Sequence, residues 1–112
     1  MDDLTQKKCV ACEGDMPPLT KDEAEILLRQ VPGWEVSDDG KMISKSWKFK
    51  NFAEALAFVN TIGAIAESEG HHPDISFGWG RVEVSLTTHA IKGLSENDFI
   101  VAAKIEATAR AH

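Results

Sequence analysis

The sequence predicts an α+β fold in the order αββαββα, with a four-stranded antiparallel sheet and helices on one of its faces. Three segments place apolar residues at steps of three or four after helix-capping residues, which is the pattern of helices with one buried face. Four short segments alternate apolar and polar residues, as half-buried strands do. Only short turns separate these segments within each pair, so each pair can form a hairpin, and hairpins build antiparallel sheets.

A helix followed by a hairpin is predicted in the first half of the chain. Thr20 and Glu23 form a capping box, and apolar residues then recur at helical spacing, so a helix is expected over 20–31. A Pro-Gly pair ends it. Alternation then begins at Trp34, turns at an Asp-Asp-Gly sequence and resumes over 43–49, which indicates two antiparallel strands.

The second helix is predicted over 52–69. Asn51 and Glu54 supply a second capping signal at its start. One apolar stripe runs along it, consisting of Phe52, Leu56, Val59, Ile62 and Ala66. Each large member would contribute roughly 1.5–3 kcal/mol on full burial, so we expect this stripe to hold the helix against the sheet.

A restricted turn follows the second helix. Gly70 can adopt the left-handed conformation that ends a helix, and Pro73 forces His72 to be extended. The second hairpin then spans two alternating segments at 75–79 and 82–86 and ends near His89. These features place His71 and His72 at a helix exit and His89 at a strand end.

The third helix is predicted to start at Ser95 and Asp98 and to continue almost to the C-terminus. With 112 residues and 43% hydrophobic composition, the chain has the size of one domain. We expect a polar N-terminal arm over residues 1–18, which ends in Pro17-Pro18, and a single domain over 19–112.

Charge and composition exclude several classes of protein. The net charge of −6 and the lack of any Lys/Arg run longer than two argue against direct nucleic-acid binding. No apolar stretch approaches a membrane span, and the polar start does not resemble a secretory signal, so we expect a cytoplasmic protein without a membrane partner. Cys9 and Cys12 are interpreted as two reduced thiols on a flexible arm, with half a zinc site or a redox pair as weaker alternatives.

Three of the four histidines are the candidate catalytic residues: His71, His72 and His89. Their predicted positions allow them to converge on one cleft, and an imidazole with an unperturbed pKa of about 6.5 can both give and take a proton near neutral pH. Glu67 precedes His71 by one helical turn, so its carboxylate is expected to hydrogen-bond and orient that ring. Acid/base chemistry is the natural inference.

Two alternatives remain open from the residues alone. The histidines can be ordinary surface residues beside a proline turn. Glu67, His71, His72 and His89 can also be a metal site, although side chains of adjacent extended residues diverge and fit one tetrahedral ion poorly. Acid/base work without a metal is therefore favoured over a metal centre.

A wider set of residues surrounds the histidines and forms a recognisable motif. It consists of Glu67, His71-His72-Pro73, Trp79, Thr88-His89, Gly93-Leu94-Ser95 and Asp98. In these residues the sequence resembles a known family, the pterin-4a-carbinolamine dehydratases. The resemblance extends over about residues 19–108 and leaves out the N-terminal arm with its cysteines.

The resemblance implies an αββαββα fold that forms homodimers or homotetramers. It implies removal of water from 4a-hydroxytetrahydropterin to give quinonoid dihydropterin, without metal or cofactor, in recycling the pterin of aromatic amino-acid hydroxylases. By the same resemblance His71, His72 and His89 are the active-site histidines. The supporting residues would be Glu67, Pro73, Trp79, Thr88 and Asp98.

Dehydration requires one group to protonate the leaving hydroxyl and another to remove the proton from N5. We expect His71 and His89 to share these roles, in an order the sequence leaves open, and His72 to bind and orient the ring. Two other functions stay open. Members of the family also act as dimerisation cofactors of a transcription factor through a helix, and a zinc-dependent hydratase is the weaker alternative.

Overall fold

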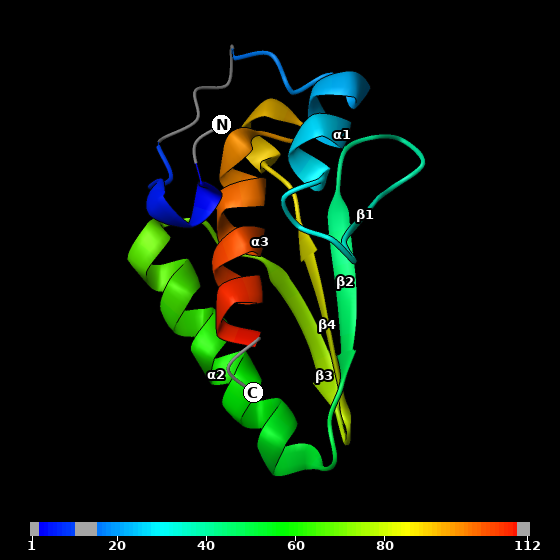
Figure 1. Ribbon diagram of the computed structural model, residues 1–112, viewed down its shortest axis with the longest axis vertical. Helices are drawn as coiled ribbons and strands as arrows, with labels where there is room; N and C mark the ends of the chain where they lie inside the picture. The colour runs from blue at the N-terminus through cyan, green and yellow to red at the C-terminus, as the bar shows by residue number, and fades with distance from the viewer. Residues whose placement is uncertain (1–2, 11–15, 110–112) are drawn as a thin grey trace.

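The computed structural model describes residues 3–10 and 16–109, which form three α-helices and one four-stranded sheet (Figure 1). The element order confirms the predicted αββαββα fold, with two short 3-10 helices in addition. The elements are η1 (Leu4–Gln6), α1 (Lys21–Leu28), β1 (Glu35–Val36), β2 (Ile43–Lys48), α2 (Phe52–Glu69), β3 (Asp74–Gly78), β4 (Arg81–Leu86), η2 (His89–Ile91) and α3 (Glu96–Ala109).

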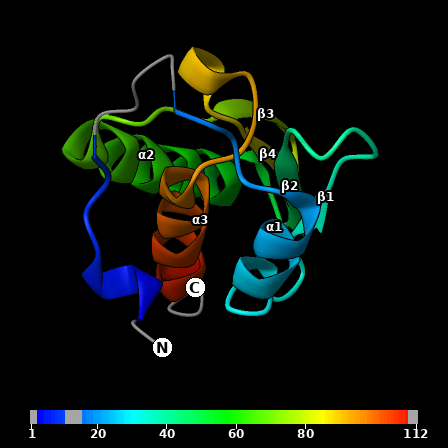
Figure 2. The same cartoon turned by 90° about the horizontal axis from the view of Figure 1, so that it is seen from above.

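The sheet is antiparallel throughout, with strand order β1-β2-β4-β3. The central strand β4 pairs with β2, where Ile43 lies opposite Leu86, and with β3, where Asp74 lies opposite Ser85. Its alternate residues Val82 and Val84 are fully buried. Figures 1 and 2 show α2 and α3 on the same side of this sheet, as the sequence predicts.

The predicted caps are present at the first two helices. Thr20 accepts a hydrogen bond from the Glu23 amide, and the Glu23 carboxylate accepts one from the Thr20 amide, so the capping box is complete. Asn51 accepts from the Glu54 amide at the start of α2. Helix α1 ends at Leu28, earlier than predicted, because residues 29–31 continue as a tighter turn with i→i−3 hydrogen bonds.

The predicted apolar stripe of α2 is partly wrong. Phe52 and Leu56 are 46% and 39% exposed, and the buried face consists of Ala55, Phe58, Ile62 and Ala66. Phe58 sets this orientation, because its ring packs on Trp47 with a centroid distance of 5.0 Å and on Phe49 at 5.2 Å. Apolar residues occur almost all around the first turns of α2, so periodicity alone does not identify the buried face.

Helix α3 lies at the centre of the fold. Nine of its fourteen residues are buried, including Phe99, Ile100 and Ile105. Glu106 accepts a hydrogen bond of 3.0 Å from the buried indole of Trp34 and forms an ion pair with Lys45. A helix this buried offers little surface to a partner, which argues against α3 as the helix of the dimerisation contact considered from the sequence.

The N-terminal segment is attached to the domain over the part that the structure describes. Leu4 is 1% exposed and belongs to the hydrophobic core, where η1 packs against α3. Lys7 forms an ion pair of 3.0 Å with Glu96. Residues 4–10 therefore differ from the flexible arm expected for 1–18. Across residues 3–10 and 16–109, no helix combines the length and apolar character that crossing a membrane would require.

Candidate active site

The chain geometry brings the two histidine-bearing segments to one end of the sheet. Gly70 adopts the predicted left-handed conformation with φ 65°, and the Gly70 and His71 amides both donate to the Ala66 carbonyl. Strand β3 then starts at Asp74, opposite Ser85 near the end of β4. Because β3 and β4 are paired, the residues just before β3 and just after β4 are neighbours.

A cavity of about 310 Å³ lies where these segments meet. All three predicted histidines line it, so the structure brings together the residues that the sequence singles out. The full lining consists of Val10, Gly70, His71, His72, Thr87, Thr88, His89, Ala90 and Asn97.

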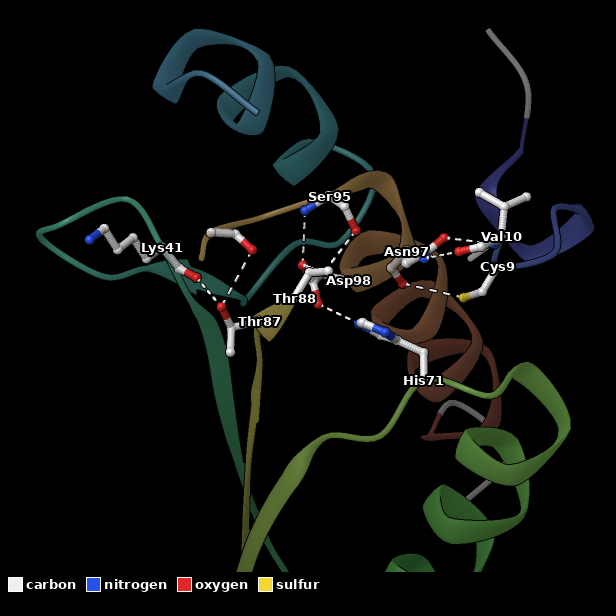
Figure 3. A network of polar contacts seen from close by, with 10 residues as sticks. Cys9, Val10, Lys41, His71, Thr87, Thr88, Ser95, Asn97 and Asp98 are labelled. Carbon is white, nitrogen blue, oxygen red and sulfur yellow. Dashed lines mark hydrogen bonds and ion pairs between the residues drawn. The ribbon is translucent and has the colours of Figure 1, made fainter. Parts of the chain in front are cut away.

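His71 is held by a buried carboxylate (Figure 3). Its Nε2 atom lies 2.6 Å from Oδ1 of Asp98, whose side chain is 0% exposed, while the imidazole itself is 13% exposed. The second oxygen of Asp98 accepts from the Thr88 hydroxyl at 2.8 Å and from the Ser95 amide at 3.0 Å. The Thr88 and Ser95 hydroxyls also lie 2.8 Å apart. Both oxygens of this buried carboxylate thus have hydrogen-bond partners, as burial of such a group requires.

Asp98 both caps the start of α3 and contacts His71. The contact with the Ser95 amide is the returning half of a capping box at the start of α3, as predicted. The contact with His71 fixes the orientation of the imidazole. When neutral His71 donates from Nε2 to the carboxylate, its Nδ1 atom carries the lone pair and can accept a proton.

The predicted pairing of Glu67 with His71 is wrong. Glu67 instead contacts His72, with Oε2 and Nε2 separated by 2.7 Å, and both side chains are largely exposed. The physical reason is that α2 ends at Glu69 and the chain turns at Gly70, so the four-residue spacing does not continue on one helix face. The two adjacent histidines consequently diverge, one toward a buried acid and one toward a solvated acid.

His89 differs from the other two histidines. It is exposed and begins η2 directly after Thr88, and neither ring nitrogen has a hydrogen-bond partner among the described residues. The amide of Thr88 bonds the carbonyl of Gly93, which closes this short loop. A Cβ on Gly93 would lie 2.7 Å from the Pro18 side chain, so glycine is required for that close approach.

The remaining predicted residues fall at two places. Thr88 is 4% exposed and lines the cavity, and Pro73 lies half-buried between the histidine pair and β3. Trp79 is 74% exposed in the turn between β3 and β4. That turn is at the opposite end of the hairpin, about 16 Å away by strand rise. The structure therefore places Trp79 outside this cavity, contrary to the expected role in supporting the pocket.

Some lining residues were not predicted as site residues; Gly70, Thr87 and Ala90 adjoin predicted ones on the histidine-bearing segments, and two others come from outside those segments. Val10 belongs to the N-terminal segment, and Asn97 precedes Asp98 at the start of α3. Neither type of residue marks a site in a sequence, and only the fold shows that they meet. The one sequence feature that points to them is that Val10 directly follows Cys9 and Asn97 directly precedes Asp98, two residues that the sequence already singles out.

Cys9 lies beside the cavity in a protected environment. Its amide donates to Oε1 of Glu69 at 2.9 Å, and burial with the nearby Glu69 charge raises the pKa of the thiol to about 12. The Glu69 carboxylate is bonded by Lys104 at 2.6 Å and by the Cys9 amide, and these contacts lower its pKa. A thiol of this kind stays protonated and is not a nucleophile at neutral pH. Cys12 lies outside the described residues.

Among residues 3–10 and 16–109, no three His, Cys, Asp or Glu side chains are arranged to hold a metal ion. Of the four residues of the alternative metal site, Glu67 and His72 contact each other, whereas His71 contacts Asp98 and His89 is hydrogen-bonded to neither pair among the described residues. A larger cavity of about 490 Å³ lies between β2, the start of α2 and the end of α3. It has no histidine in its lining, so the smaller cavity is the candidate active site.

The fold and this cavity define a small α+β domain with three histidines in the lining of one cavity. Comparison with known proteins identifies the family of this domain. The chain belongs to the pterin 4 alpha carbinolamine dehydratase family, whose family model matches residues 17–108. Membership confirms the resemblance predicted from the sequence and places the chain among the hydro-lyases.

Similar proteins cover nearly the whole chain. A Rubrobacter xylanophilus protein provisionally named pterin-4-alpha-carbinolamine dehydratase is 53% identical over 106 residues, which are 95% of this chain and 98% of that protein. A Methylococcus capsulatus protein with the same provisional name is 52% identical over 92% of this chain and 90% of its own. The first alignment is too long to omit the N-terminal segment, so the similarity extends beyond the range expected from the sequence.

Two solved structures share the fold. A transcriptional coactivator/pterin dehydratase from Brucella melitensis is 37% identical with a TM-score of 0.78, over 82% of this chain and 98% of that one. A pterin dehydratase-like protein, identified as a RuBisCO assembly factor in the alpha-carboxysome, is 28% identical with a TM-score of 0.61, over 71% and 93% of the two chains.

Proposed function

We propose that this chain removes water from 4a-hydroxytetrahydropterin to give quinonoid dihydropterin by histidine acid/base catalysis. The observation that carries the proposal is the contact between His71 and the fully buried Asp98 in a cavity shared with His72 and His89. Family membership supports the pterin substrate. A cavity of about 310 Å³ is at the lower end of the range for small-molecule sites, which suits a bicyclic ring.

The reaction needs two proton transfers and no redox step. The bond between C4a and the hydroxyl oxygen breaks, and a proton delivered to that oxygen lets it leave as water. The proton on N5 departs as its electron pair forms the C4a=N5 double bond. One acid and one base therefore complete the reaction, and exchange with solvent restores both groups.

We assign the base to His71 and the acid to His89. The Asp98 carboxylate accepts a hydrogen bond from Nε2–H of neutral His71. The Nδ1 atom of this tautomer is unprotonated and can therefore take the proton from N5. His89 is exposed and has no competing partner among the described residues, so it can load a proton from solvent and donate it to the hydroxyl. His72, held by Glu67 at the rim, would bind and orient the ring.

The proposal requires neither metal nor organic cofactor, because protonation of the leaving oxygen replaces Lewis-acid activation. In the cell the reaction would recycle the pterin of an aromatic amino-acid hydroxylase, in the cytoplasm, with the chain acting as a homodimer or homotetramer. Exposed Phe52 and Leu56 on α2 are consistent with such self-association.

The test is the dehydration rate followed by ultraviolet absorbance. Each good general acid or base contributes about 10²–10⁴ in rate, so His71→Ala and His89→Ala should each lose activity by that factor. Full activity in both variants would overturn the assignment. Elemental analysis of the purified enzyme checks the metal, because stoichiometric zinc lost together with activity on chelation would favour the zinc-hydratase alternative.

A protein-interaction function is the second candidate. It is favoured by the exposed apolar side chains of Phe52, Leu56 and Trp79 and by the solved relatives described as a coactivator and an assembly factor. A stoichiometric partner recovered with protein that lacks dehydratase activity would rank this function first. Loss of that partner in Trp79→Ala but not in His71→Ala would separate it from catalysis.

A further inference from the structure

The N-terminal segment forms part of the wall of the histidine cavity. Val10 is one of its lining residues, together with Asn97 and the three histidines. We propose that Val10 is a specificity-determining residue that contacts the substituent at C6 of the pterin, and that Asn97 is the positioning residue that holds Val10 in place. This inference rests on the proposed function, because it names the part of the pterin that the segment recognises.

The backbone of Val10 is fixed by the side chain of Asn97. The Asn97 Oδ1 atom accepts the Val10 amide at 3.1 Å, and its Nδ2 atom donates to the Val10 carbonyl at 2.6 Å. Asn97 is 5% exposed, so this two-point contact is shielded from solvent on the protein side. A two-point contact sets orientation as well as distance.

Cys9 adds a second attachment one residue earlier. Its amide donates to Glu69, and its Sγ atom lies 3.7 Å from the Asn97 carbonyl. Glu69 is itself held by Lys104, and its side chain is only 6% exposed. The segment is thereby joined to the end of α2, two residues before His71, and to α3, which carries Asp98.

The side chain of Val10 is not needed for that attachment. It is 67% exposed, although both backbone groups of the residue are bonded by Asn97. An aliphatic group that is held rigidly at the wall of a cavity, and contributes little to the core, is available to bury a ligand's apolar surface.

The position of the segment relative to the proposed base identifies the part of the substrate. Asp98 orients His71, the proposed base for N5, and the preceding residue, Asn97, holds Val10. In the pterin ring N5 lies between C6 and C4a, so the C6 substituent and the C4 carbonyl both leave the ring near the atom that His71 would deprotonate. Because the Val10 side chain is aliphatic and carries no hydrogen-bonding group, it suits the carbon chain on C6 rather than the polar C4 carbonyl.

The experiment compares two substrates that differ only at C6, one with a dihydroxypropyl chain and one with a methyl group. Val10→Ala should raise KM for the longer substrate by about 3- to 30-fold, change kcat less than about threefold and affect the methyl substrate less. Asn97→Ala should shift KM in the same direction. The double variant should be no worse than the stronger single variant, because Asn97 acts through Val10.

Ile26→Ala is the matched control, since it truncates an aliphatic side chain that is 47% exposed on α1 and outside the cavity. Its KM should equal that of the wild type. Equal KM values in Val10→Ala, or fully additive effects in the double variant, would overturn the inference. If Asn97→Ala fails to fold, the Val10→Ala comparison alone still decides whether Val10 contacts the C6 group.

Direct binding separates this inference from the proposed function. Fluorescence titration with the two corresponding 7,8-dihydropterins gives a Kd for each without turnover. Wild-type protein that binds the longer dihydropterin more tightly, with the preference reduced in Val10→Ala, supports the inference even if no dehydration is observed. Absence of dehydration by the wild type overturns the proposed function, and equal Kd values, or no binding, overturn the inference.

Discussion

Replacing Asp98 with asparagine should disable His71 while leaving the fold in place. One carboxylate oxygen accepts two donors, the Thr88 hydroxyl and the fixed Ser95 amide, and the other faces His71 Nε2. An asparagine that aimed its NH₂ group at the Ser95 amide would lose a buried hydrogen bond, at a cost of about 1–3 kcal/mol. The amide nitrogen is therefore expected to face His71.

That orientation reverses the tautomer of the imidazole. Nε2 must now accept, so the ring proton moves to Nδ1, the atom that we assign as the base. If one tautomer of His71 is favoured by about 1–3 kcal/mol, its population exceeds that of the other tautomer by roughly 5- to 150-fold. We expect kcat to fall at least tenfold, with about 10⁴-fold as the ceiling for complete loss of a general base, and KM to change less than about threefold.

Ultraviolet kinetics measure both constants, and thermal unfolding verifies that the variant is folded. Glu67→Gln is the matched comparison, because it alters the other histidine–carboxylate pair, which is largely exposed. An exposed pair contributes about 0–1 kcal/mol, so its effect on kcat should be much smaller. A folded Asp98→Asn enzyme with kcat within threefold of the wild type would refute the tautomer argument.

Three further predictions concern the surroundings of the site. In a Cys12→Ser background, Cys9 at pH 8 should react with iodoacetamide about 1000-fold more slowly than an ordinary thiol, because its pKa is raised to about 12; equal rates in native and denatured protein would contradict this. Glu106→Leu should lower the free energy of unfolding by about 1–3 kcal/mol, because the Trp34 indole loses its acceptor; an unchanged urea midpoint would exclude that role. The pKa of Glu69 is lowered in the folded state, so the stability difference between wild type and Glu69→Gln should be present at neutral pH and vanish as acid protonates the carboxylate; a difference that persists at pH 2 would be inconsistent with this linkage.

Local signals in the sequence predict the elements well. The capping residues Thr20 and Asn51, and the left-handed Gly70, act through contacts within a few residues of themselves, so their effects can be read without knowing the fold. The same holds for the turn at Pro73, which separates the histidines from β3. These local rules were sufficient to place His71 and His72 at a helix exit.

Tertiary contacts account for the predictions that failed. Glu67 and His71 have helical spacing, yet the helix ends between them, and the partner of His71 comes from α3 instead. Phe52 and Leu56 fit a helical stripe, but the packing of Phe58 on the sheet turns that face outward. In each case a contact distant in the sequence decides between arrangements that local periodicity allows equally.

The N-terminal segment shows the same limitation at the site. Nothing in its composition indicates that Val10 lines the cavity, because its position depends on the Asn97 side chain from the other end of the chain. Acid/base chemistry could be proposed from the histidines alone, whereas the residues that form the rest of the cavity wall depend on the fold.

The most direct test of the account is the rate of quinonoid dihydropterin formation from 4a-hydroxytetrahydropterin, with and without the chain, after treatment with a strong chelator. We expect the chelated chain to accelerate dehydration well above the spontaneous rate, and His71→Ala, assayed in parallel, to show an acceleration that is lower by a factor of about 10²–10⁴. A chelated wild-type chain that does not exceed the spontaneous rate would contradict this expectation.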